Sequence, residues 1–338
     1  MMKAVRLYAA KDLRVETIDP PATLEPGWVR LKVSAAGICG SDLHNFMTGQ
    51  WISRSPSVAG HEFAGVVTEI GADVTGFKPG DTVIADSRYW CGECPSCKSG
   101  RQNVCETLGF IGEVCDGGFA EETALPARLL VHYDQAISPV VAAMGEPLSV
   151  ALHAIRKQRV PSGEAVLVVG CGPIGGLAAL LLSRLHDGPV LVCDRNDQRA
   201  NLVSTVTGAI KVPLDKTAIE AALDGQPIRY AIDATGNINV LKATLDVLSG
   251  GGSLALVGIS HGRIELDPNI LVEREISLIG CHAYQDELPE IAKLLPDLEA
   301  QLLRLVDREI SLDEVPDAYA RLIAAEANGL KTIIRPGM

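Results

Sequence analysis

Four closely spaced cysteines predict a metal site. Their pattern is Cys91-x2-Cys94-x2-Cys97-x7-Cys105. Four thiolates at this spacing can surround one tetrahedral Zn²⁺ and fill every coordination position, which is typical of a structural site. The alternative is four free or oxidised thiols, which is disfavoured for a clustered set in a reducing compartment. We therefore expect a structural zinc ion held by Cys91, Cys94, Cys97 and Cys105.

A second set of potential ligands lies in two glycine-flanked segments and one later acid. GICGSDLH contains Cys39, and GHEFAG contains His61 and Glu62. A lone cysteine is more typical of an apolar core, and a lone histidine is more often structural. Together, the three residue types form a ligand set for a catalytic zinc that leaves a position for substrate. Glu146 is a further candidate, although it could instead pair with a Lys or Arg near a domain boundary.

A glycine-rich turn predicts a dinucleotide-binding site. The segment GCGPIG follows the apolar run Ala165–Val169 and begins a helical pattern over Ile174–His186. The first glycine permits a tight turn, the second admits the pyrophosphate, and the third lets the helix pack closely on the strand. The alternative is a glycine turn that binds no ligand. The expected cofactor contacts in this turn are Gly170, Gly172, Pro173, Ile174 and Gly175.

The choice between NAD and NADP depends on the end of the next strand. Asp194 follows the run Val190–Cys193 and lies 19 residues after Gly175. A carboxylate there can accept hydrogen bonds from the ribose hydroxyls and would repel a 2′-phosphate, which favours NAD. Arg195 beside it could instead hold a phosphate. Arg199 is a further candidate for binding the cofactor.

The elements that would position these residues show two different patterns. The first part of the chain has short β-rich runs broken by glycine and proline, which predicts an irregular antiparallel β domain. Six strands alternating with helices follow, which predicts an α/β fold with a doubly wound parallel sheet. The expected limits are 1–147 with 283–338 for the catalytic domain and 148–282 for the nucleotide-binding domain.

The tail after the sixth strand is too short to form a domain of its own. It carries helical patterns over 286–304 and 312–328 and a final strand over 331–335. We expect this tail to return to the first domain.

Composition and charge exclude several classes of protein. The chain has 338 residues with 30 basic and 42 acidic side chains, a formal charge of −12. This acidity and an aromatic content of 4% argue against nucleic-acid binding, which needs clustered cations or stacking surfaces. The N-terminus has no apolar signal segment, and the longest apolar runs are too short to span a membrane. We therefore expect a cytoplasmic protein with neither a nucleic-acid nor a membrane partner.

In their order along the chain, these segments resemble one enzyme family. GICGSDLH, GHEFAGVV, the four-cysteine lobe, EPLSVALHA and GCGPIGG resemble the zinc-dependent medium-chain dehydrogenase/reductase family over nearly the whole chain. The Glu-Pro-Leu segment resembles its sorbitol and idonate (polyol) dehydrogenase branch. The resemblance implies a GroES-like catalytic domain, a Rossmann domain, NAD, two zinc ions per chain, and assembly as a homodimer or homotetramer.

The resemblance also implies a role for each candidate residue. The implied ligands of the catalytic zinc are Cys39, His61, Glu62 and Glu146. Asp42 would accept a hydrogen bond from His61 and fix its tautomer. Ser41 would take the substrate proton, and His44 would pass it to solvent. The nicotinamide half of the cofactor would lie along Ala234, Thr235, Gly236, Val257 and Gly258.

The implied reaction is oxidation of a secondary hydroxyl of a polyol or sugar derivative by hydride transfer to NAD. Two departures concern the substrate: Asn45 stands where polyol dehydrogenases often have an aromatic residue, and Ala283 where they often have arginine. The missing arginine argues against sorbitol and simple sugar acids. The alternatives are an L-threonine 3-dehydrogenase, a short-chain diol dehydrogenase or, in another class, a catalytically idle NAD-binding zinc protein.

Overall fold

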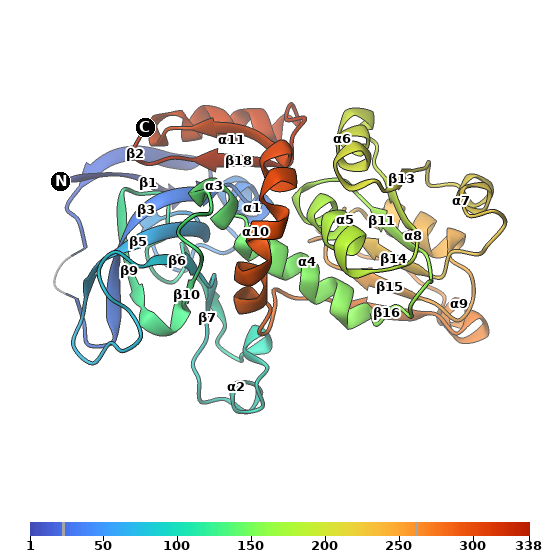
Figure 1. The fold of residues 1–338 in the computed structure, drawn as a ribbon, viewed down its shortest axis with the longest axis horizontal. Coiled ribbons are helices and arrows are strands. Elements are labelled where there is room, and N and C mark those ends of the chain that lie inside the picture. Colours follow the sequence, from blue (N-terminus) through green and yellow to red (C-terminus); the bar gives the residue numbers. More distant parts are fainter. Residues whose placement is uncertain (22–23, 261) are drawn as a thin grey trace. The chain divides into compact units, whose positions relative to one another are not determined.

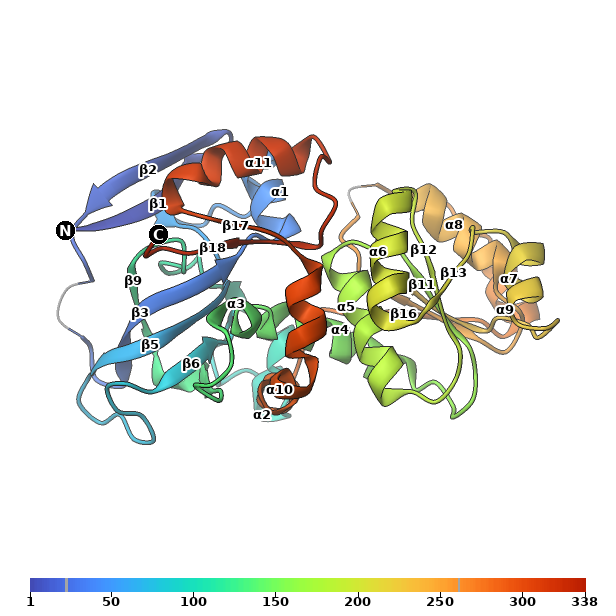
Figure 2. The ribbon, with the colours of Figure 1, turned by 45° about the horizontal axis from the view of Figure 1, so that its top comes forward.

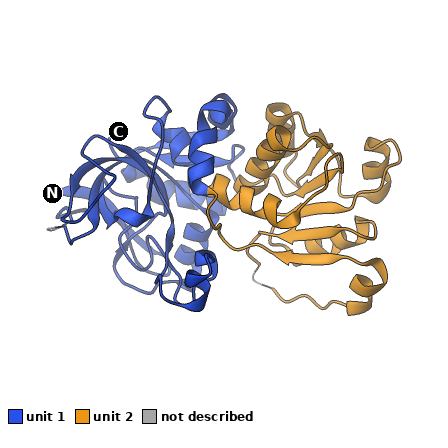
Figure 3. Cartoon of the chain, turned by 60° about the horizontal axis from the view of Figure 1, so that its bottom comes forward, with its two compact units in different colours: residues 1–146, 288–338 blue, residues 147–287 orange. Residues whose placement is uncertain are grey.

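The computed structural model describes residues 1–21, 24–260 and 262–338, which form two compact units. Unit 1 comprises Met1–Glu146 and Leu288–Met338, and unit 2 comprises Pro147–Glu287 (Figure 3). The second limit lies after Glu287 instead of after residue 282. The physical reason is a buried contact within unit 2, where His153 Nδ1 and Glu287 Oε1 lie 2.9 Å apart.

Unit 1 is built on two β-sheets. The larger has the order β10-β6-β5-β3-β18-β17 with β9 also paired to β3, and the smaller has the order β2-β1-β4 (Figure 1). All of these pairs are antiparallel except β17 with β18. The strands are β1 (Met2–Ala9), β2 (Asp12–Ile18), β3 (Trp28–Gly37), β4 (Ser57–Val58), β5 (Glu62–Ile70), β6 (Thr82–Ala85), β9 (Glu122–Pro126), β10 (Leu130–His132), β17 (Val306–Ile310) and β18 (Lys331–Ile334).

The tail differs in part from the expectation. The pattern expected to be helical over 312–328 forms a 3-10 turn, Leu312–Glu314, and helix α11 (Val315–Ile323), after which the chain turns at Ala325 with a φ of +59°. Strand β17 was not expected, and it lies beside β18 (Figure 2). The other helices of unit 1 are α1 (Gly40–Thr48), α2 (Pro95–Lys98), α3 (Pro139–Ala142) and α10 (Leu288–Leu305).

Two short hairpin strands and one apolar core complete unit 1. Strand β7 (Arg88–Tyr89) pairs with β8 (Gly109–Phe110) at the base of the cysteine lobe. The core is formed by alternate residues of the larger sheet, with Leu31 and Phe63 fully buried. Because successive side chains of a strand point to opposite faces, this alternation buries one face of the sheet.

Unit 2 is the parallel sheet that the sequence predicts. Its order is β13-β12-β11-β14-β15-β16, and every pair is parallel. The four residues of β11 are all buried, as expected for a strand covered on both faces. Strand order reverses between β11 and β14, and ligands bind beyond the carboxyl ends of strands at such a point. The strands are β11 (Val166–Val169), β12 (Val190–Cys193), β13 (Ile210–Lys211), β14 (Tyr230–Asp233), β15 (Ser253–Leu256) and β16 (Ser277–Gly280).

Helices connect these strands. Helix α5 contacts β11, β12 and α6. These contacts hold the glycine-rich turn, which lies between β11 and α5, at the carboxyl end of β11. The helices are α4 (Gly145–Gln158), whose first two residues belong to unit 1, α5 (Pro173–Leu185), α6 (Asp197–Thr207), α7 (Lys216–Ala222), α8 (Ile238–Val247) and α9 (Pro268–Arg274). In the described part of the chain, no helix has the length and apolar content that crossing a membrane requires.

Candidate metal centres and cofactor site

The four cysteines of the lobe lie close together. Their Sγ atoms are within 4.8 Å of one another, with 3.5 Å between Cys91 and Cys105, 3.9 Å between Cys94 and Cys105, and 4.0 Å between Cys91 and Cys97. A regular tetrahedron with Zn–S bonds of about 2.3 Å has S···S edges of about 3.8 Å. The cluster therefore has the size of a zinc site, and its separations are far longer than a disulfide bond of about 2.05 Å.

Backbone N–H groups stabilise thiolates in this cluster. The N–H groups of Glu93 and Cys94 donate to Cys91 Sγ at 3.4 Å, and that of Cys97 donates to Cys94 Sγ at 3.4 Å. The N–H groups of Glu93 and Cys94 lower the pKa of Cys91, because they stabilise its charged thiolate form. The donor set and its backbone fit a structural zinc ion.

We expect Cys91→Ser to lose the structural zinc and to lower the free energy of unfolding by about 3 kcal/mol, since the loss of a metal is among the largest single-site effects. Metal analysis by mass spectrometry and unfolding in urea would measure both effects. Cys115→Ser, which alters a half-buried thiol outside this cluster, is the control. Full zinc content with an unchanged unfolding midpoint in Cys91→Ser would contradict the assignment.

Three of the four expected catalytic ligands form one group. Cys39 caps the N-terminus of α1, His61 precedes β5, and Glu62 begins it. The pairing of β3 with β5 places Gly37 opposite Glu62, which brings the end of β3 beside the start of β5. One ligand atom from each of Cys39, His61 and Glu62 lies within 4.8 Å of the others. This cysteine, histidine and carboxylate set fits a catalytic zinc with an open position.

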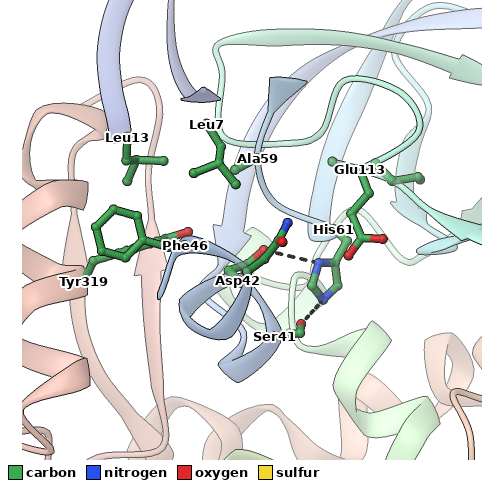
Figure 4. A pocket seen from close by; sticks show the side chains of 12 residues that line it. Leu7, Leu13, Ser41, Asp42, Phe46, Ala59, His61, Glu113 and Tyr319 are labelled. Atoms are coloured by element: carbon green, nitrogen blue, oxygen red, sulfur yellow. Dashed lines mark hydrogen bonds and ion pairs between the residues drawn. The ribbon is translucent and has the colours of Figure 1, made fainter. Parts of the chain in front are cut away.

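Asp42 and Ser41 flank the two nitrogens of His61. Asp42 Oδ1 lies 3.4 Å from His61 Nδ1, and its other oxygen accepts a hydrogen bond from the Cys39 N–H at 2.8 Å. Ser41 Oγ lies 3.4 Å from His61 Nε2 (Figure 4). Burial lowers the pKa of His61, but the charges of Asp42 and Cys39 outweigh burial and raise it well above its ordinary value. Asp42 thus orients the ring through Nδ1, so that Nε2, the nitrogen that could bind a metal, lies beside the Ser41 hydroxyl.

Glu62 Oε1 is buried and has no hydrogen-bond or ion-pair partner among the described residues. Lys331 Nζ forms an ion pair with Glu62 Oε2 and donates to the Ile38 carbonyl at 3.0 Å. Gly37 leaves space for this carboxylate, since a Cβ there would lie 2.5 Å from Oε2. A buried carboxylate oxygen without a partner is costly unless a cation meets it, so Oε1 of Glu62 fits a metal ion in addition to the Lys331 contact of Oε2.

Lys331 is a functional candidate that sequence reasoning missed. It is 1% exposed at the start of β18, so its charge is enclosed by protein. The available signal was a lysine at the start of a short apolar strand, which is unusual because lysines are almost never fully buried unless paired.

Glu146 lies outside the group of three ligands. Its Oε1 accepts a hydrogen bond from Ser87 Oγ at 2.6 Å, and the residue is 5% exposed. The pKa of Glu146 is raised to about 7, chiefly by burial, with a lowering effect of the His61 charge and a raising effect of the Glu62 charge included. The charges of His61 and Glu62 therefore act on Glu146, but its carboxylate is hydrogen-bonded to Ser87.

We expect Glu146→Ala to lower kcat/KM by about 10- to 100-fold, the size typical of a group that supports metal ligands. NAD affinity should stay unchanged, because the glycine-rich turn is untouched. Steady-state kinetics with zinc analysis would measure this, and Ser87→Ala would show how much depends on the hydrogen bond that holds Glu146. A Glu146→Ala protein with full zinc and full turnover would show that this acid has only a structural role.

His44 lies on the same helix as Ser41. Its Nε2 is 2.9 Å from Gln50 Oε1 and 3.3 Å from Thr48 Oγ1, and its ring centroid is 4.7 Å from that of Trp51. These polar contacts are exposed, which is compatible with the expected passage of a proton to solvent.

A small pocket adjoins the candidate catalytic residues (Figure 4). Its volume is about 20 Å³, and Ser41, Asp42 and His61 line it together with Glu113. Sequence reasoning missed Glu113, because an acid in a loop that belongs to no recognised motif carries no signal of its own. Burial raises the pKa of Glu113 to about 7, opposed by the charge of His61.

The glycine-rich turn of unit 2 has the backbone that a dinucleotide needs. Gly170 has a φ of +94°, which favours glycine, and its N–H donates to the Cys193 carbonyl at 2.8 Å. A Cβ at Gly175 would lie 1.7 Å from the Gly170 oxygen, whereas a Cβ at Gly172 would project into open space. This open space, at the N-terminus of α5, is where a pyrophosphate would lie. Pro173 and Ile174 form the first turn of that helix.

A pocket of about 580 Å³ lies beside this turn. It has the volume of a small-molecule site. The expected cofactor residues that line it are Gly170, Gly172, Asp194, Arg195, Arg199, Ala234 and Thr235. Asp194 accepts backbone hydrogen bonds from Cys171 and Asn196 at 2.6 Å, so it also holds the turn in shape.

The remaining expected contacts lie at the ends of β14 and β15. The N–H groups of Val257 and Gly258 both donate to the Asp233 carbonyl at 3.0 Å. A Cβ at Gly258 would lie 2.2 Å from the Gly236 nitrogen, so the two glycines pack backbone to backbone. These residues are thus together beyond the carboxyl ends of the strands, as expected for the nicotinamide half of the site.

Comparison with known proteins identifies the family. Residues 25–135 match the alcohol dehydrogenase GroES-like domain, and residues 173–297 match the zinc-binding dehydrogenase domain. The chain is 30% identical to the L-galactonate-5-dehydrogenase of Escherichia coli K12 over 90% of both chains. It is 31% identical to the (R,R)-butanediol dehydrogenase of Bacillus subtilis 168 over 99% of this chain and 100% of the relative.

A solved structure is similar throughout. A putative zinc-binding dehydrogenase from Sinorhizobium meliloti 1021, bound to NADP, superposes with a TM-score of 0.92 at 30% identity and 99% coverage of both chains. The chain belongs to the zinc-dependent medium-chain dehydrogenase/reductase family. It is an alcohol dehydrogenase of that family, with zinc and a nicotinamide dinucleotide as cofactors.

Proposed function

We propose that this chain oxidises a secondary hydroxyl of a polyol or related small alcohol with NAD as acceptor. The observation that carries the proposal is the Cys39, His61 and Glu62 group, which combines an open ligand set with a serine hydroxyl beside it. The names of the galactonate and butanediol relatives support a substrate with neighbouring oxygens.

The residues divide the chemistry between them. Zinc held by Cys39, His61 and Glu62 would supply charge stabilisation at the substrate oxygen, and NAD would supply the hydride acceptor. Ser41 Oγ, on the Nε2 side of His61, is placed to take the hydroxyl proton from a substrate there. Asp42 keeps the imidazole in one tautomer. His44, on the exposed side of α1, would release the proton to solvent.

Asp194 sets the proposed preference for NAD. Its carboxylate lines the cofactor pocket beside Arg195, where a 2′-phosphate would meet a negative charge. We expect Asp194→Ala to weaken NAD binding by about tenfold and to improve NADP relative to NAD, because ribose hydrogen bonds and phosphate repulsion are both removed.

Asp194→Asn is the matched variant, since it removes the charge but keeps one side-chain oxygen, which can accept from either the Cys171 or the Asn196 N–H. Titration of both cofactors by fluorescence quenching would compare the variants. A wild-type preference for NADP would show that Arg195, and not Asp194, governs cofactor choice.

The test of the proposed function is NAD⁺ reduction, followed by absorbance, against a panel of polyols, sugar acids, diols and threonine. We expect turnover with at least one neutral polyol or diol, and loss of that turnover in His61→Ala. No reduction with any member by zinc-loaded protein would overturn the proposal and favour a catalytically idle NAD-binding protein.

Two wider expectations remain predictions. We propose assembly as a homodimer or homotetramer and a cytoplasmic location, as the resemblance implies. Light scattering of the purified protein would test the first, and a single-chain mass would contradict it.

A further inference from the structure

Glu113 lies in a loop that is held against the candidate ligand group. The loop follows β8, and the Glu113 N–H donates to the Phe110 carbonyl at 3.1 Å while Ser53 Oγ donates to the Glu113 carbonyl at 2.8 Å. These two hydrogen bonds fix the backbone of Glu113 on both sides, so its side chain starts from a defined position.

Close backbone packing sets the distance from this loop to His61. A Cβ at Gly112 would lie 3.1 Å from the Gly60 nitrogen, and one at Gly117 would lie 2.1 Å from the Gly60 oxygen. The Gly118 N–H donates to the Gly60 carbonyl at 2.9 Å. The loop therefore lies directly along the residue that precedes His61.

The Glu113 side chain faces the small pocket together with His61 (Figure 4). Among the described residues, its carboxylate has no hydrogen-bond or ion-pair partner. The residues lining the pocket include two acids, Asp42 and Glu113, and no lysine or arginine. The nearby Arg54 forms an ion pair with Asp116. Among the described residues that line the pocket, His61 is the one potential cation, so the pocket holds more acidic than basic groups beside the candidate catalytic residues.

The size of the pocket limits which chemical group can bind to the Glu113 carboxylate. About 20 Å³ is room for one water-sized group. Asp42 is already engaged by the Cys39 N–H and by His61, which leaves Glu113 as the acid available to a ligand. A partly buried carboxylate is satisfied best by a cation that donates hydrogen bonds, and an ammonium group is such a cation of this size.

We propose that Glu113 is a specificity-determining residue that binds the ammonium group of an amino alcohol substrate and rejects alcohols bearing a carboxylate or phosphate. This inference rests on the proposed function for the chemistry of the substrate. It adds the class of substrate: a secondary alcohol with a nearby amine. An anionic group would meet Asp42 and Glu113 without a compensating lysine or arginine in the pocket.

Two matched sets of alcohols would test the proposal. The short set is 1-amino-2-propanol, 1,2-propanediol and lactate, and the long set is glucamine, sorbitol and gluconate. Within each set only one terminal group changes, from ammonium through hydroxyl to carboxylate. Turnover would be measured at about pH 8, above the pKa of about 7 to which burial raises the Glu113 carboxyl, so that this group is charged. Calorimetry with zinc-loaded protein and NADH would measure binding of each compound independently of turnover.

We expect the ammonium member of at least one set to have the highest kcat/KM, by about tenfold over the hydroxyl member, as for a hydrogen bond to a charged group. Glu113→Gln should bring this ratio to about one, mainly through KM, with little change in kcat for the hydroxyl member. Glu113→Asp should keep part of the preference. Glu326→Gln is the control, because it removes the same charge from an exposed site of unit 1.

The outcomes separate the two proposals. Turnover with an unchanged ammonium-to-hydroxyl ratio in Glu113→Gln, or a wild-type preference for the carboxylate member, would overturn this inference and leave the proposed function intact. Binding of the ammonium compounds that depends on Glu113, without NAD⁺ reduction by any alcohol, would uphold the inference and overturn the proposed function. Ammonium compounds that neither bind nor react would overturn the inference.

Discussion

Cys39→Ser should lower kcat/KM by about 1,000-fold, equivalent to about 4 kcal/mol, because it removes the sulfur ligand from the candidate catalytic zinc group. The helix that Cys39 caps should survive, since serine is a preferred N-cap residue. The effect therefore falls on the metal and not on the fold. Serine is a harder and weaker ligand than a thiolate, so the protein should retain one zinc per chain, in the cysteine lobe.

Kinetics and metal analysis on the same preparation would test this prediction. Cys281→Ser is the matched control: its half-buried thiol lies in unit 2 and donates to the Ile279 carbonyl, a bond that serine can keep. Turnover and zinc content of the control should equal those of the wild type. Cys39→Ser with wild-type turnover would show that the three-residue group is not the catalytic centre.

Gly175→Ala should damage both cofactor binding and the stability of unit 2. Its Cβ would lie 1.7 Å from the Gly170 oxygen, and that oxygen belongs to the backbone of the turn. Because no side chain can move aside, α5 must shift away from β11. We expect a loss of about 3 kcal/mol in the free energy of unfolding, the upper end for overpacking, and at least about a 100-fold loss in NAD affinity.

Gly172→Ala separates the two effects. A Cβ at this position meets no protein atom within 4 Å, so it should weaken NAD binding by occupying the pyrophosphate space and leave the unfolding midpoint unchanged. Thermal unfolding and NAD titration of both variants would measure the difference. A Gly175→Ala protein that binds NAD as the wild type does would contradict the dinucleotide assignment.

Local patterns explain why much of the fold could be predicted. Strand β11 is buried on both faces, so Val166–Val169 is a continuous apolar run that is visible without tertiary information. The four-cysteine spacing is local as well. Strand β17 was missed because three consecutive charged residues, Asp307–Glu309, separate its apolar ends and give no alternation of apolar and polar residues.

Contacts between distant segments explain what could not be predicted from the residues alone. Lys331 reaches Ile38 and Glu62 from the other end of the chain, and Ser87 reaches Glu146 from a different strand. No sequence motif around Glu113 indicates a functional role for it. The residue types of Cys39, His61 and Glu62 indicated a zinc ligand set, but the pairing of β3 with β5 that brings them together could not be predicted from the sequence.

The central claim is that a zinc ion at Cys39, His61 and Glu62 is required for NAD-linked oxidation of an alcohol. The most direct measurement is NAD⁺ reduction by one protein preparation before chelation, after chelation that removes one zinc per chain, and after zinc is restored. We predict turnover that is lost with the first zinc and recovered with one equivalent of Zn²⁺, while the fold persists. Undiminished turnover by protein that has lost the zinc of this group would contradict the claim.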